Sequence, residues 1–179
     1  MEYHFDVPVG TEKIKKLNVG DIIYVSGKIF TARDEAHHMM LEKDSLPFDP
    51  SEMALFHCGP LMKKENDKWK VISAGPTTSS RMEIFEDKFI EKYCINIIIG
   101  KGGMGKRTEQ ALQKHGGVYT AYTGGAGALA ADRMEEVLEV HWLDELGMPE
   151  AVWIFKAKEF GPLVVAIDSH GKSIYKKSK

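Results

Sequence analysis

The chain has 179 residues, of which 43% are hydrophobic and 28% charged, so it is long enough for one domain with a buried core. Its formal net charge of -2 provides no basic field of the kind that nucleic-acid-binding proteins use. Its apolar runs are far shorter than the roughly 18 residues of a membrane span, and the N-terminus does not resemble a signal peptide. We therefore expect a single cytoplasmic domain over residues 1–179, with neither nucleic acid nor a membrane as partner.

The two cysteines limit the metal chemistry of this chain. Cys58 and Cys94 lie far apart and outside any C-x-x-C pattern. Neither a disulfide scaffold nor a self-contained zinc or iron-sulfur site is therefore supported. We expect no metal ligands from this chain, and we expect both cysteines to pack as small hydrophobic residues.

The first third of the chain predicts a strand followed by a helix. Residues 22–30 are mainly β-branched and aromatic, and Gly27 is expected to form a bulge. Thr31 is the expected cap of the helix that follows, whose first turn is acidic. Arg33 and His37 are four residues apart, so this helix would place a cation and a titratable imidazole on one face.

The middle of the chain predicts short strands, loops and one helix. Prolines and charged residues mark the turns, whereas β-branched and aromatic residues mark the strands. The expected elements are a loop over 45–51, a strand over 54–57, a hairpin turn over 63–68, a strand over 69–74 and a helix over 79–92. Met82, Phe85 and Phe89 form an apolar stripe on that helix and are predicted to be core residues.

The second half of the chain predicts a central strand, followed by further helices and strands. Residues 94–99 are almost entirely apolar, which is typical of a strand covered on both faces. A helix over 106–115 should bury Ala111 and Leu112. The remaining expected elements are a strand over 118–122, a helix from Gly124 to Met134, and strands over 137–142, 151–157 and 162–167. Many strands with interspersed helices predict a mixed, layered α/β fold.

Two strand-to-helix junctions carry basic and hydroxyl groups. The first is Gly75-Pro-Thr-Thr-Ser-Ser-Arg-Met82, with Thr77, Thr78 and Arg81, and the second has Lys101 just after the central strand. Helix N-termini attract anions, and a guanidinium can bind a carboxylate through two parallel bonds. We expect the strands before the two junctions to be parallel neighbours, so that Arg81 and Lys101 form one acid-binding site.

A nucleotide-binding loop is the rival interpretation of the second junction. Residues 100–107 nearly match G-x-x-x-x-G-K-[ST], but Arg107 occupies the position of the hydroxyl residue that would bind magnesium. The apolar run 163–168, which ends in Asp168, also imitates the acidic strand of a nucleotide hydrolase. We therefore retain nucleotide binding only as a weaker alternative.

Seven runs, in this order and spacing, carry a resemblance to a known family. They are SGKIFTARDEAHH, FHCGP, GPTTSSRM, IIIGKGGMG, GGAGALAA, ELGMPEAVW and FGPLVVAIDSHG. Together they resemble the beta subunit of the iron-sulfur-dependent class I fumarate hydratase and L(+)-tartrate dehydratase family, over roughly Lys16 to Tyr175. The resemblance implies a three-layer swivelling β/β/α domain. It also implies a cluster-bearing alpha subunit as partner, which would hold a 4Fe-4S cluster, in a higher hetero-oligomer.

The implied reaction is the reversible hydration of fumarate to L-malate, with L(+)-tartrate dehydration as the alternative. At the glycine loop, one-chain fumarases have a sequence similar to KGNR, whereas this chain has Lys101-Gly-Gly-Met104. This difference makes the chain resemble the two-subunit enzymes. The substrate therefore stays open between fumarate and tartrate. A domain without enzymatic activity that binds nucleotides or small acids is the alternative from a different class.

The resemblance also implies roles for individual residues. Substrate carboxylates would be held by Arg33, Arg81 and Lys101, with Thr77 and Thr78 beside the reacting carbons. The candidate catalytic residues are Thr77 as base, His37 as its rival and Asp34, which would orient His37 or stabilise the helix start. The binding residues are expected at an exposed, partly polar face that awaits the partner.

Other interpretations of these side chains remain open. Arg81 could instead pair on the surface with Glu83 or Asp87, an interaction worth well under about 1 kcal/mol. We expect only structural roles for His57, His115 and His141.

Overall fold

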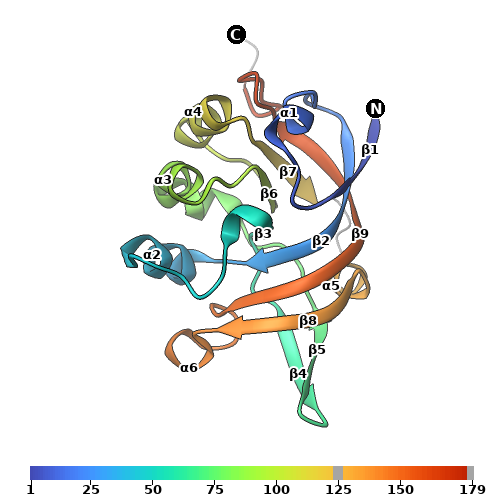
Figure 1. Cartoon of the computed structure of the whole chain (residues 1–179). Coiled ribbons are helices and arrows are strands. Elements are labelled where there is room, and N and C mark those ends of the chain that lie inside the picture. Colours follow the sequence, from blue (N-terminus) through green and yellow to red (C-terminus); the bar gives the residue numbers. More distant parts are fainter. Residues whose placement is uncertain (123–126, 177–179) are drawn as a thin grey trace.

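The computed structural model describes residues 1–122 and 127–176, and it has a mixed α/β fold (Figure 1). Its strands are β1 Glu2–Asp6, β2 Ile22–Thr31, β3 Ala54–Phe56, β4 Leu61–Glu65, β5 Lys68–Ser73, β6 Ile97–Gly100, β7 Val118–Tyr122, β8 Met134–His141 and β9 Val152–Ile167. Its α-helices are α1 Thr11–Ile14, α2 Asp34–Glu42, α3 Glu83–Tyr93, α4 Lys106–His115, α5 Gly127–Asp132 and α6 Leu143–Leu146. Short 3-10 helices span Pro50–Glu52 and Ser79–Met82.

The main sheet closes on itself. Its strand order is β1-β2-β3-β6-β7-β9-β8, and β2 also pairs with β9, so β2, β3, β6, β7 and β9 form a ring. The pairs from β1 through β7 are parallel, whereas β9 pairs antiparallel with β2, β7 and β8. Figure 1 shows β2 and β9 as long arcs on the side of this ring opposite α2, α3 and α4.

Two apolar cores fill the two spaces that this arrangement creates. The first lies inside the ring and includes Ile97 and Ile99 of β6. The second lies between the ring and helices α2, α3 and α4, and it includes Ile98 of the same strand. Alternate side chains of a strand point to opposite faces, so β6 is apolar throughout because it faces both cores. The predicted central strand is confirmed, and the cores separate two β layers and one α layer.

The expected pair of strands over 151–157 and 162–167 is one continuous strand, β9. Its pairing with β2 passes from Val25↔Phe160 to Ile23↔Leu163 across an irregularity in the register. Gly161 and Pro162 fall inside this irregularity, where a missing amide hydrogen costs no regular ladder bond. Gly161 and Pro162 therefore mark a bulge within β9 rather than the end of a strand.

Most predicted helices are present, with corrections at their starts. Thr31 is not a cap: it ends β2, where its Oγ1 accepts a hydrogen bond from the Trp153 amide at 3.0 Å, and Arg33 is the N-cap of α2. Ala111 and Leu112 are buried as predicted.

The apolar stripe of α3 is confirmed at Met82 and Phe89, which are buried. Phe85 is only half-buried, because it lies at the margin of the helical layer against the rings of His37 and His38.

The segment around α5 is only partly described. The start of the helix expected from Gly124 lies outside the described residues, and α5 runs from Gly127 to Asp132. β8 begins at Met134, three residues before the expected start at Val137. Within the described residues, no helix combines the length and apolar character that crossing a membrane requires.

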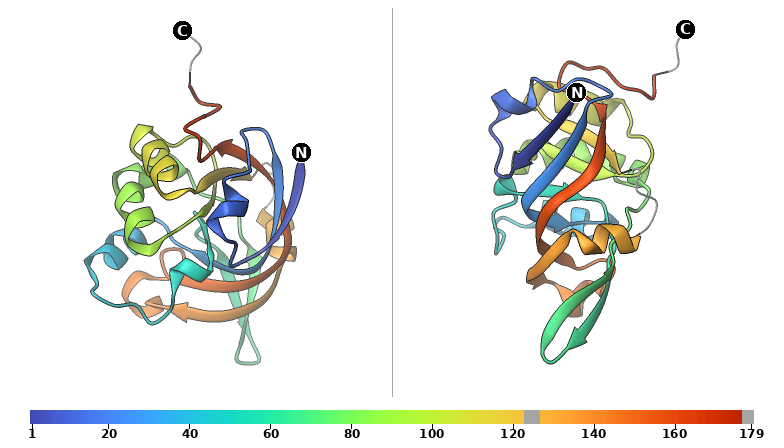
Figure 2. Two further views of the ribbon diagram at one scale, coloured as in Figure 1. Left: turned by 45° about the horizontal axis from the view of Figure 1, so that its top comes forward. Right: turned by 90° about the vertical axis from the view of Figure 1, so that its right-hand side faces the viewer.

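Strands β4 and β5 form a separate two-stranded hairpin. Figures 1 and 2 show it projecting from the end of the molecule that carries β8. Its second strand leads directly into the Gly75–Met82 junction, so this junction is approached from outside the main sheet.

Gly27 provides a test of how β2 bends. Its φ is +106°, and a Cβ atom placed on it would lie 2.9 Å from both Cγ2 and the carbonyl oxygen of Val7. We expect Gly27→Ala to reduce the free energy of unfolding by about 1–3 kcal/mol, since both the backbone angle and the close approach disfavour a side chain. Urea denaturation would measure this. Gly10→Ala is the matched control, because no atom lies within 4 Å of that position, and equal stability losses in both variants would contradict the prediction.

Candidate active site

The two predicted junctions meet in the structure, but through loop contacts rather than neighbouring strands. The strand before the first junction is β5, which belongs to the hairpin, so the expected parallel neighbours are wrong. Instead the Thr77 amide donates to the His57 carbonyl at 2.8 Å, and the Ser79 amide donates to the Lys101 carbonyl at 3.1 Å. Thr78 and Lys101 form an isolated parallel bridge. Arg81 and Lys101 are thereby carried by two connected loops.

Ser79 is the residue that joins these loops most closely. Its Oγ accepts a hydrogen bond from the Lys101 amide at 3.0 Å and lies 2.8 Å from Nδ1 of His57. A Cβ atom placed on Gly100 would lie 1.9 Å from this Oγ. The glycine before Lys101 is therefore required by the buried serine hydroxyl rather than by a bound phosphate.

Arg81 faces two of the predicted site residues. Its Nη2 donates to Oγ1 of Thr77 at 2.9 Å and lies 3.4 Å from Oδ1 of Asp34. The alternative surface pairing of Arg81 with Glu83 or Asp87 is wrong, because Asp87 instead binds Arg107 and Glu83 binds backbone amides. The guanidinium thus connects the first junction with the start of α2.

Arg33 lies at the same end of α2, held by groups far away in sequence. Its Nε is 3.2 Å from the Glu150 carboxylate, which also accepts a hydrogen bond from the Glu35 amide. A Cβ atom placed on Gly59 would lie 2.7 Å from Cδ of Arg33, so Gly59 leaves room for this side chain. Arg33 keeps 26% of its side chain exposed.

The glycine loop that carries Lys101 is anchored by two tyrosines. The Gly102 carbonyl accepts hydrogen bonds from Tyr119 at 2.7 Å and from Tyr175 at 2.6 Å. Gly102 has a φ of +74°, a backbone conformation that favours glycine. The loop is thus held by its backbone, while the Lys101 side chain is exposed.

The N-terminus of α4 is filled by the protein's own carboxylate. Glu83 accepts hydrogen bonds from the amides of Gly105, Arg107 and Thr108 and from the Thr108 hydroxyl. A Cβ atom placed on Gly105 would lie 2.6 Å from Oε1 of Glu83. These amides are therefore not free for an external anion, which corrects the expectation that the helix end at the second junction binds the acid and removes the support for a phosphate-binding loop.

The predicted binding residues are accessible to solvent, as predicted. Arg33 and Thr77 are half-buried, and Arg81 and Lys101 are exposed. Thr78, beside them, is also exposed. The side chains of Arg33, Arg81 and Lys101 therefore supply positive charge to this face.

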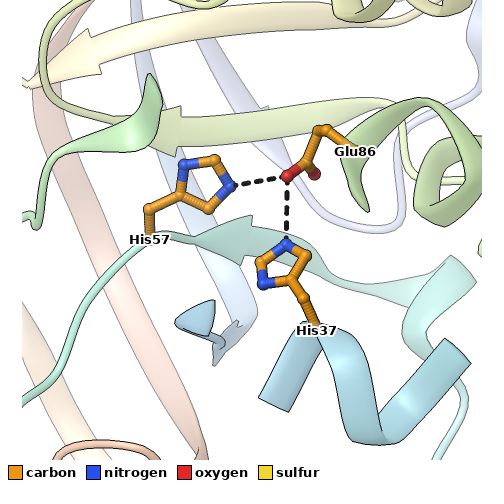
Figure 3. Close-up of side chains that lie close together, drawn as sticks. All are labelled: His37, His57 and Glu86. Atoms are coloured by element: carbon orange, nitrogen blue, oxygen red, sulfur yellow. Dashed lines mark hydrogen bonds and ion pairs between the residues drawn. The ribbon is translucent and has the colours of Figure 1, made fainter. Parts of the chain in front are cut away.

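A buried group of ionisable residues lies beneath that face (Figure 3). The Glu86 Oε2 atom is 3.0 Å from Nε2 of His37 and 3.1 Å from Nε2 of His57. Nδ1 of His37 is 2.8 Å from the carbonyl oxygen of Arg33. All three side chains are fully buried.

The hydrogen-bond partners assign a charge to each of these groups. Nδ1 of His37 donates to the Arg33 carbonyl, and Nε2 lies 3.0 Å from the Glu86 carboxylate in an ion pair without hydrogen-bond geometry, so we assign the ring as an imidazolium. His57 donates from Nε2 to Glu86 and accepts at Nδ1 from the Ser79 hydroxyl, so it is neutral. The buried positive and negative charges thus balance.

The pKa shifts agree with these assignments. Burial alone would lower the pKa of His37, but the adjacent Glu86 carboxylate produces a net rise. Burial lowers the pKa of His57, and the His37 charge adds to this effect. Burial would raise the pKa of Glu86, yet the charge and hydrogen bonds of the two imidazoles hold it well below its usual range.

The same three residues place one ligand atom each within 4.8 Å of the others, as the ligands of a metal ion would be. The Glu86 oxygen lies 3.0 and 3.1 Å from the two ring nitrogens, which are hydrogen-bond lengths. Two ligands of one zinc ion, each bound at roughly 2.0–2.2 Å, also lie little more than 3 Å apart, so these distances do not separate the two arrangements. The protonation states do: a ring nitrogen that carries a proton toward Glu86 has no lone pair for a metal ion, so the charges assigned above favour an ion pair over a metal centre in the described residues.

The cysteines provide no alternative set of metal ligands. Cys58 is buried, and burial raises the pKa of its thiol, so it stays protonated. Cys94 is exposed at the C-terminus of α3. A four-iron cluster needs several thiolates, so the residues of this chain do not fit one.

Four residues of this region were not predicted to belong to the site: Ser79, Glu86 and Glu150 were given no role, and His57 was expected to be structural. Ser79 and Glu150 do lie in the runs that carry the family resemblance, which was the available signal. Glu86 had no such signal, because an acidic residue on an amphipathic helix is usually exposed.

The two buried histidines predict a stability maximum near pH 6.5, the ordinary histidine pKa. Above it, the folded chain retains a proton on His37 that the unfolded chain releases, so stability falls as pH rises toward the folded-state pKa of His37. Below it, the unfolded chain protonates His57 whereas the folded chain does not, so stability falls again. Each slope should be about 1.4 kcal/mol per pH unit.

Urea denaturation at closely spaced pH values would measure this profile. His38→Gln, which changes an exposed histidine adjacent to His37, should keep the same maximum. A profile that rises steadily from pH 5.5 to pH 8 in both proteins would contradict the assigned charges.

Comparison with known proteins identifies the family. The model of the Fumarase C-terminus family matches residues 3–178. The chain is 51% identical to a Methanocaldococcus jannaschii protein named "Putative L(+)-tartrate dehydratase subunit beta", over 98% of this chain and 91% of that protein. It is 45% identical to the Escherichia coli L(+)-tartrate dehydratase subunit beta, over 96% of this chain and 86% of that protein. It is also 44% identical to a Geobacillus stearothermophilus "Putative fumarate hydratase class I", over 94% of this chain and 32% of that protein. The chain belongs to the Fumarase C-terminus family.

Proposed function

We propose that this chain is the beta subunit of a two-subunit hydro-lyase that reversibly hydrates fumarate to L-malate. The names of its relatives support a hydro-lyase beta subunit. The observation that carries the proposal is the set of contacts that links these residues: Arg81 donates to Thr77 and pairs with Asp34, the neighbour of Arg33, and Thr78 forms a backbone bridge with Lys101. Three cations beside a hydroxyl suit a small dicarboxylic acid, with the alpha subunit closing the site.

The cations have two tasks in this reaction. They bind the two carboxylates of the substrate, with Thr78 beside them. They also stabilise the charge that develops on one carboxylate when the proton next to it is removed, and this charge is larger in the transition state than in the ground state. The pairings of Arg33 with Glu150 and of Arg81 with Asp34 keep the guanidinium groups oriented before the substrate arrives.

Thr77 is the proposed base. Its hydroxyl oxygen accepts a hydrogen bond from Arg81, and a neighbouring cation favours the deprotonated form of a hydroxyl. A carboxylate from the alpha subunit would take the hydroxyl proton. Both nitrogens of His37 are engaged within the buried group, so we propose no direct proton transfer by His37. Asp34 orients Arg81 in this scheme.

The iron-sulfur cluster belongs to the alpha subunit in this proposal. The two cysteines of this chain cannot supply its ligands, and Cys58 is held as a buried thiol. We further propose that the two subunits form a higher hetero-oligomer in the cytoplasm.

L(+)-Tartrate is the second candidate substrate. The relatives reported above with 51% and 45% identity carry tartrate dehydratase names, whereas the relative with the fumarate hydratase name is 44% identical. Tartrate differs from malate by one additional hydroxyl group. Turnover of the assembled enzyme with L-malate and with L(+)-tartrate would decide between the two.

The first test of the proposal is assembly. The full chain alone should show neither hydratase activity nor cluster absorbance, because it lacks the cluster ligands. Activity should appear when it is mixed with an iron-loaded alpha subunit, as followed by fumarate absorbance. Substantial turnover by this chain alone would refute the two-subunit proposal.

The second test concerns the cations. Arg81→Lys keeps the charge but loses the two-pronged geometry, so we expect kcat/KM of the assembled enzyme to fall roughly ten- to a thousandfold. Lys101→Ala should cause a loss of similar size, and both variants should keep their stability because these side chains are exposed. Lys114→Ala, an exposed lysine on α4 that pairs with Glu91, is the control. If both site variants stayed within twofold of wild type, the acid-binding site would lie elsewhere.

A further inference from the structure

The buried ionisable group is continuous with the backbone of two proposed substrate-binding residues. At one end, the Lys101 amide donates to Oγ of Ser79, which contacts Nδ1 of His57. At the other end, His37 donates both from its Nδ1 and from its backbone amide to the Arg33 carbonyl. We use the name His–Glu–His chain for His37, Glu86 and His57.

The His–Glu–His chain crosses three separate elements. His37 is on α2, His57 follows β3 and Glu86 is on α3, so its hydrogen bonds join segments that are distant in sequence. Figure 3 shows both rings directed at one carboxylate oxygen. Because each contact is fully buried, moving any member leaves a polar or charged group without a partner, at a cost several times that of losing an exposed pair.

The proton pattern of this connection has a fixed direction. The Arg33 carbonyl can only accept, so Nδ1 of His37 must donate. Glu86 is ionised: it accepts a hydrogen bond from Nε2 of His57 and forms an ion pair with Nε2 of His37, which leaves Nδ1 of the neutral His57 ring as the acceptor for Ser79. The Ser79 hydroxyl therefore donates to His57 and is free to accept from the Lys101 amide. Each bond thus determines the orientation of the next.

We propose that the His–Glu–His chain is a positioning unit that sets the separation of Arg33 and Lys101, and thereby the length of dicarboxylate that the site accepts. This inference rests on the proposed function, in which Arg33 and Lys101, together with Arg81, bind the two carboxylates. Its members are positioning residues, because they are buried beneath the surface that would meet the substrate. Diacids one carbon longer or shorter would be rejected because the backbone atoms that carry the two cations are held at a constant spacing.

The least disruptive test is Ser79→Ala, which cuts the connection at the Lys101 end without removing a buried charge. We expect kcat/KM of the assembled enzyme for fumarate to fall about ten- to a hundredfold, since a displacement near 1 Å can cost about a hundredfold. The ratio of kcat/KM for fumarate to kcat/KM for a five-carbon unsaturated diacid should fall at least threefold. If activity fell while this ratio stayed unchanged, the claim that the His–Glu–His chain sets the accepted substrate length would be overturned.

Glu86→Gln is the second variant, because it keeps the side-chain shape and removes the charge. We expect a similar loss of kcat/KM, whereas Glu91→Gln, an exposed carboxylate on the same helix, should match wild type. Should Glu86→Gln fail to fold, Ser79→Ala decides the question.

Nitrogen-15 NMR of the histidine rings in the full chain gives a readout independent of activity. At pH 7 the wild type should show two ring protons on His37 and only the Nε2 proton on His57. Glu86→Gln should remove one ring proton from His37, and Ser79→Ala should shift the Nδ1 resonance of His57. A stoichiometric metal ion bound to the two rings, or two neutral rings in the wild type, would overturn the proposal.

The outcomes separate this inference from the proposed function. If Arg81→Lys and Lys101→Ala lose activity while Ser79→Ala and Glu86→Gln stay within twofold of wild type, the positioning role is refuted and the acid site stands. If Arg81→Lys and Lys101→Ala are also fully active, the proposed function itself fails.

Discussion

The ionised Glu86 carboxylate between two imidazoles is the interaction on which the arrangement of this surface depends. A carboxylate without exposure to water is strongly disfavoured unless charge and hydrogen bonds compensate for the lost hydration. His37 supplies the charge, and His57 supplies a further hydrogen bond. Because α2, α3 and the segment after β3 each contribute one partner, this compensation is possible only when all three are correctly placed.

The closed ring of strands brings these segments together. Parallel pairing of β2, β3, β6 and β7 places the ends of consecutive strands along one edge, and the loops that follow carry Arg33, His57 and Lys101. The antiparallel strand β9 closes the ring and completes the inner core. The hairpin β4–β5 is outside the ring, yet it delivers Thr77 and Arg81 to the same edge from another direction.

The glycines of this region argue against a phosphate-binding loop and are compatible with a carboxylate-binding site. Gly100 and Gly105 leave room for Ser79 and Glu83, which are the protein's own polar groups. The backbone amides that would receive a phosphate in a nucleotide-binding loop are therefore already bonded. Positive charge is instead presented by the side chains of Arg81 and Lys101, which suits a carboxylate ligand and a partner that completes the site.

The sequence by itself determined the mixed α/β class, the buried central strand β6 and the family, because apolar periodicity and short motifs are local properties of the chain. It also indicated Arg33, Thr77, Arg81 and Lys101, although their catalytic and binding roles remain proposals. Local patterns misplaced the cap at Thr31 and divided β9, because long-range hydrogen bonds and a bulge overrode the local signals.

Only the tertiary structure decided how the site is held together. No spacing in the sequence relates Glu86 to His37 and His57, since burial of a carboxylate depends on partners from other elements. The same holds for the contact of Ser79 with Lys101, which replaced the expected pairing of neighbouring strands. Local residue patterns determine which elements form, whereas the charge state of a buried group depends on the whole fold, because desolvation and its compensation are long-range effects.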